Sequence, residues 1–303
     1  MKKKRTVKKL VTHDGSFHSD DVFAAAALSL FLKRRKEKFK IIRTRDEKII
    51  KAGDYVFDVG GIYNPKKNFF DHHQRRGAGQ RKNGIPYSSF GLVWKKFGPG
   101  ICSSKAVAEM IDRKLVGPVD AEDSGFDLAK SIGGEAFPYT VQNMINAFLP
   151  TWREKKNQNE IFPKLAQIAK TILLREIKVA NDLSKAQKIF DKAYQKSKDK
   201  KIVVLNRHFT RDEFNSGFEK FPRTVFVIYP RSSGEWKAES LRKSTYVMTS
   251  KKNFPKIWAG LRNQDLQKVS EVPDAIFCHR GLFLAVAKSK KGAIRLAELA
   301  LKK

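Results

Sequence analysis

The first 60 residues alternate between short apolar segments and one longer apolar helix pattern. Residues 9–12, 40–44 and 55–58 have the length and the β-branched or aromatic content of buried strands. Residues 22–32 lie between the first two segments and are apolar enough for a largely buried helix. A strand, a helix and a second strand in this order form a parallel βαβ unit. The sequence therefore predicts an α/β fold with a parallel sheet in its N-terminal domain.

Polar residues mark the ends of two of these strands. His13 follows the first strand directly, and Asp58 ends the third. In open parallel sheets, ligands bind beyond the carboxyl ends of the strands. We therefore expect His13 and Asp58 to share one site. The simpler interpretation of Asp58 is a turn residue at the end of a strand.

Four of the six histidines fall in two short clusters beside carboxylates, at residues 13–21 and 71–73. Carboxylate oxygens hold divalent charge, and neutral imidazoles favour Mn, Fe, Co or Zn over Ca or Mg. A lone buried histidine is usually a satisfied core residue, but two that flank a Gly-Ser turn after a strand indicate a metal site. If the clusters meet, they predict a metal-dependent phosphoesterase.

The pair His72-His73 can divide two roles, because one ring can bind a metal while its neighbour, pointing elsewhere, donates a proton. Asp58 can bridge two metal ions, which then lie roughly 3.5–4 Å apart.

Four further carboxylates have less certain roles. Asp14 and Asp21 are expected to cap the helix or support the ligands. Asp120 and Asp123 lie in an acidic segment, and for either of them solvation at a helix end is the default interpretation.

The formal net charge of +31 comes mostly from lysines spread over the whole chain. Such a charge attracts anionic polymers or acidic surfaces, although a lysine-rich proteome would produce the same pattern. The two cysteines are too few for a disulfide framework, which fits a reducing cytoplasm. No apolar segment has the roughly 18 residues of a membrane span. Because the first histidine cluster begins at residue 13, we expect no removable presequence.

The remaining chain predicts two domains with a boundary near residue 150. Residues 1–150 contain the histidine clusters, and residues 151–303 read as a helical connector followed by a smaller α+β domain. The connector has a helical pattern from 161 to 198, with an apolar stripe that indicates core or interface. Beyond residue 200, strand-like segments predominate.

The order of these motifs resembles the DHH phosphoesterase superfamily, and more closely the MYG family of metal-dependent hydrolases, whose eukaryotic members are described as RNA exonucleases. The resemblance spans nearly the whole chain. It rests on the following segments: His18-Ser19-Asp20, Asp58-Val59-Gly60-Gly61, Asp71-His72-His73-Gln74, Ser88-Ser89-Phe90-Gly91, Val119 to Gly125, Phe226 to Pro230, Trp258 to Arg262 and Phe277 to Phe283.

This resemblance implies six metal ligands and one catalytic acid. The ligand positions are His13, His18, Asp20, Asp58, His72 and Asp123. His73 falls on the position that protonates the leaving group. His18 stands where related phosphatases carry an aspartate. Two divalent metal ions are expected, with Mn²⁺ ahead of Mg²⁺, Co²⁺ or Zn²⁺.

Basic residues that follow the second histidine cluster, and others at and after His279, are candidates for substrate binding. His279 and Arg280 suit an anion clamp, because arginine presents a planar fork to phosphate, although a surface loop is the alternative. Lys288 and Ser289 end a segment in which this chain lacks the glycines usual for the family. Arg75 belongs to a basic loop, residues 74–83, that could follow a phosphate backbone or be merely solvated.

The predicted function is therefore metal-dependent phosphodiester hydrolysis, by an exonuclease acting on single-stranded RNA or DNA. One alternative is a hydrolase of a small phosphate compound, such as a cyclic dinucleotide or pyrophosphate. The other is a nucleic-acid-binding protein without catalysis.

Overall fold

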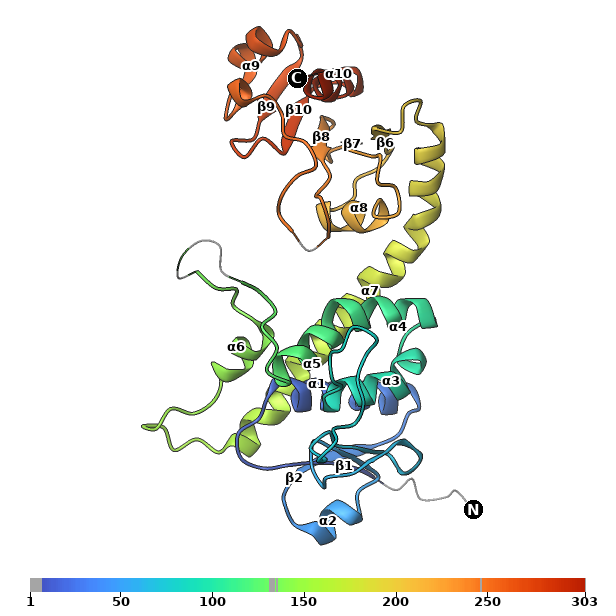
Figure 1. Ribbon diagram of the computed structural model, residues 1–303, viewed down its shortest axis with the longest axis vertical. Helices are drawn as coiled ribbons and strands as arrows, with labels where there is room; N and C mark the ends of the chain where they lie inside the picture. Colours follow the sequence, from blue (N-terminus) through green and yellow to red (C-terminus); the bar gives the residue numbers. More distant parts are fainter. Residues whose placement is uncertain (1–6, 131–133, 135, 246, 303) are drawn as a thin grey trace. The chain divides into compact units, whose positions relative to one another are not determined.

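The computed structural model describes residues 7–130, 134, 136–245 and 247–302. The chain forms two compact units, Met1–Asn181 and Asp182–Lys303 (Figure 1). The first contains a mainly parallel sheet and the second a mainly antiparallel one. The predicted α/β class is confirmed. None of the helices in the described parts is long and apolar enough to span a membrane.

The sheet of the first unit has the strand order β2-β1-β3-β5-β4. Strand β1 pairs in parallel with β2 and β3, β3 pairs in parallel with β5, and only β4 runs antiparallel to its neighbour. This order places the carboxyl ends of β1, β3 and β5 side by side. The strands are β1 Lys8–Thr12, β2 Phe39–Arg43, β3 Tyr55–Phe57, β4 Tyr63–Asn64 and β5 Phe69–Phe70.

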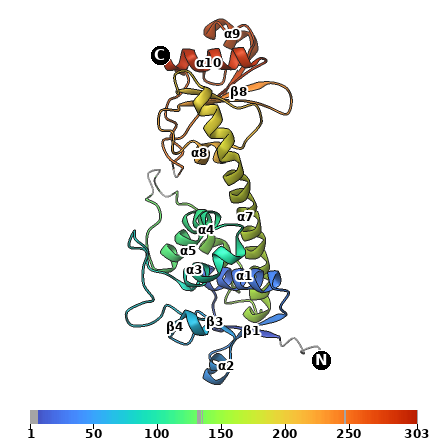
Figure 2. The ribbon, with the colours of Figure 1, turned by 90° about the vertical axis from the view of Figure 1, so that its right-hand side faces the viewer.

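Helices α1 and α3 cover one face of this sheet, and the short α2 lies on the other (Figure 2). Helix α1 is buried on almost all sides, and its run of small side chains from Ala24 to Ala27 lets α3 approach closely. The Asp21 carboxylate caps α1 by accepting a hydrogen bond from the His18 N–H at 3.0 Å. The helices are α1 Ser19–Arg34, α2 Glu47–Lys51, α3 Ser89–Ile101, α4 Lys105–Ile111, α5 Gly117–Asp123 and α6 Val141–Asn146.

The long helix α7, Gln158–Lys196, belongs to both units. Its first half packs Phe162, Leu165 and Leu173 into the core of the first unit. The units therefore divide within this helix rather than near residue 150, because its apolar stripe holds its first half against the N-terminal core.

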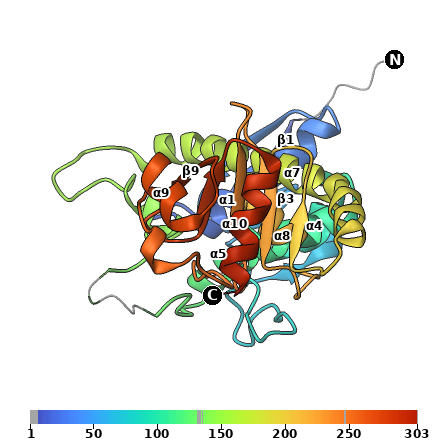
Figure 3. The ribbon, with the colours of Figure 1, turned by 90° about the horizontal axis from the view of Figure 1, so that it is seen from above.

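The second unit is α+β, with the strand order β6-β7-β8-β10-β9. Only β6 and β7 are parallel. Helix α10 packs on this sheet (Figure 3). The elements are β6 Ile202–Val204, α8 Arg211–Gly217, β7 Phe226–Pro230, β8 Trp236–Ser240, the 3₁₀ turn Lys256–Trp258, α9 Asn263–Ser270, β9 Ala275–Cys278, β10 Leu284–Ala287 and α10 Lys290–Lys302.

Candidate metal centre

His13 and Asp58 meet at the carboxyl edge of the first sheet, as expected from their places after β1 and β3. The His13 Nε2 atom lies 3.0 Å from Asp58 Oδ2 and 3.2 Å from Asp21 Oδ2. Asp58 has a left-handed backbone (φ 56°), a conformation that aspartate tolerates better than most residues. Because β1 and β3 are adjacent parallel strands, the residues that follow them emerge together.

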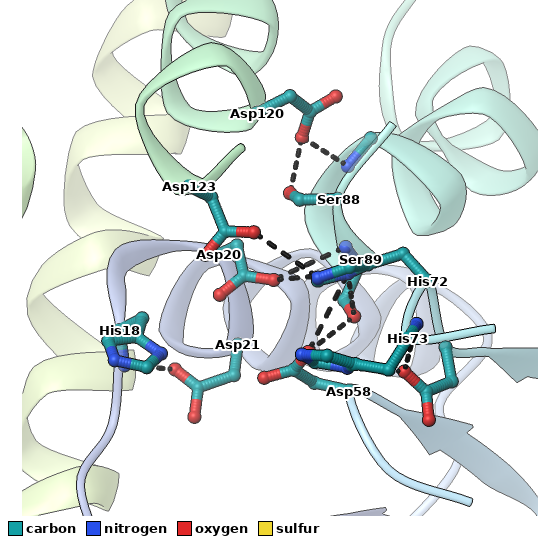
Figure 4. A network of polar contacts seen from close by, with 12 residues as sticks. His18, Asp20, Asp21, Asp58, His72, His73, Ser88, Ser89, Asp120 and Asp123 are labelled. Carbon is teal, nitrogen blue, oxygen red and sulfur yellow. Dashed lines mark hydrogen bonds and ion pairs between the residues drawn. The ribbon is translucent and has the colours of Figure 1, made fainter. Parts of the chain in front are cut away.

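His72 joins this edge to the carboxyl end of α5 (Figure 4). Its Nε2 atom lies 3.3 Å from Asp123 Oδ2, and its Nδ1 atom lies 3.7 Å from Asp58 Oδ1. The same Nδ1 atom is 3.9 Å from Asp20 Oδ2, at the start of α1. Four segments that are distant in the sequence thus contribute to one polar cluster.

The polar side chains form three groups whose ligand atoms are close enough to surround a metal ion. They are His13, Asp21 and Asp58; Asp58, Asp71, His72 and His73; and His18, Asp20 and Asp123. All six predicted ligand residues belong to these groups. The sequence interpretation assigned no ligand role to Asp21 or Asp71. Asp21 both caps α1 and faces His13, so its capping position concealed its second contact.

The buried carboxylates fit a cation. Asp20 and Asp21 are fully buried, and Asp20 Oδ1 has no hydrogen-bond partner among the described residues. Burial, together with the neighbouring Asp58 and Asp123 carboxylates, raises the pKa of Asp20 well above its usual value. Burial opposes protonation of His13, yet hydrogen bonds with Asp21 and Asp58 raise its pKa to about 10. Such a cluster needs positive charge, and divalent ions bound by oxygen and imidazole would supply it.

His73 has a different environment from His72, although the two rings stack with centroids 4.1 Å apart. The His73 side chain is 61% exposed, whereas that of His72 is 18% exposed. The His73 Nδ1 atom is 2.8 Å from Asp71 Oδ1, and this hydrogen bond raises the pKa of His73. A carboxylate only accepts, so Nδ1 carries the proton and Asp71 orients the ring.

Ser89 contacts all three groups from the start of α3, a role that the sequence interpretation missed. Its hydroxyl donates to Asp58 Oδ1 at 3.0 Å and lies 3.3 Å from His72 Nδ1. Its backbone N–H donates to Asp20 Oδ2 at 3.2 Å. The paired serines at a predicted helix start were the available signal, but serine is common at such positions.

Asp120 and Asp123, which were ambiguous in the sequence, have separate surroundings. Asp123 lies in the polar cluster, whereas the fully buried Asp120 supports the start of α3. The Asp120 Oδ1 atom accepts hydrogen bonds from the Ser88 hydroxyl at 2.5 Å and from the Gly91 N–H at 3.0 Å. A Cβ atom at Gly91 would lie only 1.9 Å from the Asp120 carboxylate, so only glycine fits there.

Arg81 forms a largely buried ion pair with Asp120. The sequence suggested that its loop either contacts phosphate or is solvated, and Arg81 does neither. Its guanidinium forms ion pairs with Asp120 and with Asp112, the latter at 2.9 Å. It also lies over the Tyr87 ring, 4.5 Å from the centroid. Its side chain is only 10% exposed. These contacts fix the loop that joins the histidine pair to α3.

Replacing Arg81 with alanine is expected to destabilise the protein by about 3–5 kcal/mol, because Asp120 would remain buried without its cation. Chemical denaturation at neutral pH measures this loss. The adjacent Lys82→Ala variant is the control, because Lys82 is exposed and should change stability little. Equal stability of the two variants would contradict the anchoring role of Arg81.

The five predicted substrate-binding residues differ in the unit to which they belong, in exposure and in hydrogen bonding. Arg75 is exposed in the first unit, in the loop after His73. In the second unit, His279 Nδ1 accepts the Gly281 N–H at 2.9 Å, and Arg280 is exposed.

Lys288 and Ser289 precede α10. Lys288 is exposed, whereas the Ser289 hydroxyl accepts the Gly292 N–H at 3.0 Å. Ser289 therefore caps α10, a structural role that the sequence interpretation did not include.

Comparison with known proteins gives a match over nearly the entire chain. Residues 9–301 match the model of the uncharacterised protein family UPF0160, labelled MYG1 exonuclease. A MYG1 protein of Chlamydia pneumoniae is 32% identical over 296 residues, covering 96% of this chain and 95% of that protein. The MYG1 exonuclease of Homo sapiens is 28% identical over 324 residues, covering 96% of this chain and 85% of that protein. The solved structure of RecJ in complex with Mn²⁺ from Thermus thermophilus is 12% identical, and the match covers 98% of this chain and 52% of that chain. Its TM-score of 0.28 is below the level that indicates a shared fold.

Proposed function

Because this chain belongs to the uncharacterised protein family UPF0160, the MYG1 exonuclease family, we propose that it is a metal-dependent phosphodiesterase that removes nucleotides from an end of single-stranded RNA or DNA. The observation that carries the proposal is the buried cluster of carboxylates and imidazoles, with the exposed His73 beside it. We further propose that the N-terminal domain is of the DHH phosphoesterase type, since its motifs occur in that order along the chain.

Two divalent ions, with Mn²⁺ expected first, would be held by His13, His18, Asp20, Asp58, His72 and Asp123. Such ions would stabilise negative charge on phosphoryl oxygens and lower the pKa of an attacking water. Asp58 belongs to two of the three groups and is the candidate for a bridging carboxylate.

The chain's own residues would perform the remaining steps. His73, whose Nδ1–H is held by Asp71, would give the proton on its Nε2 atom to the leaving oxygen of the cleaved nucleotide. Ser89 would hold Asp58 and His72 in place through its hydroxyl. Arg75, His279, Arg280 and Lys288 would contact substrate phosphates. Ser289 remains a candidate contact, although its hydroxyl already caps α10.

The domains would divide the work. Residues 1–150, within the first unit, would carry the metal ions and the Arg75 contact, and the second unit, within residues 151–303, would supply the other basic contacts to the substrate. We also propose a reducing, cytoplasmic setting, in which the buried thiols of Cys102 and Cys278 persist.

A substrate panel tests the proposal. End-labelled RNA and DNA oligomers are expected to shorten progressively from one end with Mn²⁺ and to remain intact with chelator. Oligomer affinity should fall steeply with salt, because phosphate contacts release counterions. A cyclic dinucleotide and pyrophosphate serve as small-substrate controls. Turnover of these small compounds alone, or oligomer cleavage that persists in chelator, would contradict the proposal.

A further inference from the structure

Among the described residues, the exposed Phe, Tyr and Trp side chains are confined to one part of the chain. We call residues 126–130 and 136–152 the aromatic segment. Trp152, Tyr139 and Phe137 are 87%, 73% and 71% exposed. Elsewhere in the described residues, the exposed large apolar side chains are all aliphatic or methionine. The five exposed aromatic residues of the segment are Phe126, Phe137, Tyr139, Phe148 and Trp152.

The aromatic segment is anchored to the first unit, so its rings are not exposed through detachment of the chain. Ile145 of α6 is fully buried in the core, and Leu149 packs against the same core. The Thr140 hydroxyl donates to Glu122. Figure 1 shows α6 beside α5 and α1. The segment thus packs Ile145 and Leu149 against the core while it leaves five aromatic side chains in solvent.

The anchors connect the aromatic segment to the candidate metal centre. The segment begins three residues after Asp123. The Gln142 Oε1 atom accepts the Ser19 N–H at 2.8 Å, and Ser19 is adjacent to Asp20. The segment is therefore tied at two points to the group of His18, Asp20 and Asp123. Its start follows Asp123, and its Gln142 side chain holds the residue next to Asp20.

The side-chain types indicate nucleobases as the occupant. Stacking on aromatic rings suits bases of any sequence, because each base has a π face. Cations accompany the rings, since the Arg153 guanidinium lies 4.7 Å from the Trp152 ring centroid and Lys155 is exposed. A polyanion also complements the net charge of +31.

We propose that Phe126, Phe137, Tyr139, Phe148 and Trp152 form a stacking surface for the bases of a single-stranded nucleic acid beside the candidate metal centre. This inference rests on the proposed function and names the residues that would recognise bases rather than phosphates. A substrate recognised in this way must carry nucleobases. A polyphosphate has none, so it could not stack on these rings.

Binding to the full chain in the presence of chelator tests the proposal without cleavage. The probes are a fluorescein-labelled 12-nucleotide DNA and an abasic strand of equal length and charge, measured by anisotropy. The Trp152→Ala variant is expected to bind the base-containing strand about 5-fold or more weakly, within the usual range for one stacked base. Its affinity for the abasic strand should be unchanged. The Trp152→Phe variant, which keeps a ring, should retain most of the affinity.

Tryptophan fluorescence gives a second readout. Trp94 and Trp258 are buried and Trp236 is partly buried, so Trp152 is the most exposed of the four tryptophans. The base-containing strand should quench wild-type emission, and Trp152→Phe should remove most of that quenching. The Ile257→Ala variant is the control, because Ile257 is 61% exposed but lies outside the aromatic segment.

Equal affinity of the wild-type protein for the two strands, with no quenching, would overturn the proposal. So would a wild-type dimer that Trp152→Ala converts to monomer without any effect on strand binding, since a second copy would then cover the rings. Base-dependent binding in a protein that cleaves no oligomer would support the stacking surface while removing the proposed exonuclease function.

Discussion

The Asp58→Asn variant is expected to lose most divalent-metal binding and to fall in kcat/KM on the order of 10³-fold or more, a barrier increase of about 4 kcal/mol. Asp58 belongs to two of the three candidate ligand groups and faces His13 at 3.0 Å. Removing its charge therefore weakens the environment of both proposed ions. Asparagine tolerates the left-handed backbone at this position, so the local fold should persist.

Isothermal titration with Mn²⁺ measures the loss, and thermal unfolding in chelator checks that the variant folds. Asp14→Asn is the matched control, because Asp14 is adjacent to His13 but is 48% exposed and pairs with Arg45. Full Mn²⁺ stoichiometry and wild-type activity in Asp58→Asn would refute the bridging role.

Replacing each of the two adjacent histidines with alanine is expected to cause a different defect. His72→Ala should lose metal occupancy, because His72 lies between Asp58 and Asp123. His73→Ala should keep the metal ions and lose on the order of 10²–10⁴ in rate, the usual contribution of a positioned acid. The defect should shrink for a nitrophenyl phosphodiester, since a good leaving group needs less protonation.

Metal analysis and single-turnover rates of both variants separate these roles. Restored turnover on the nitrophenyl substrate, with metal retained, would identify His73 as the acid. Equal metal loss in both variants would show that both rings are ligands, which is geometrically open because His73 Nδ1 also lies 3.6 Å from Asp58.

Local sequence pattern was sufficient to predict where the first candidate ligands would lie. His13 and Asp58 each follow a strand, and parallel pairing of neighbouring strands brings such positions together. The start of α1 similarly places Asp20 at a helix N-terminus beside the same edge. These are consequences of periodicity and of short-range chain geometry, which the sequence records directly.

The contacts that support these ligands depend on residues far apart in the chain. Ser89 reaches Asp58 across 31 positions, and Arg81 reaches Asp120 across 39. A serine at a helix start and an arginine in a basic loop have ordinary local explanations. Only the packing of α3 against α1 and α5 reveals their partners.

The sequence by itself determined the α/β pattern, the places of the strand-end candidate ligands and the separate histidine pair. The tertiary structure decided which acidic residue of α5 joins the cluster. Asp120 and Asp123 are three residues apart, so they share one side of a helix and look alike in the sequence. Asp120 meets Arg81 and the start of α3, whereas Asp123 meets His72. The difference arises because one helical turn moves a side chain about 5 Å along the axis, enough to change every neighbour in a packed core.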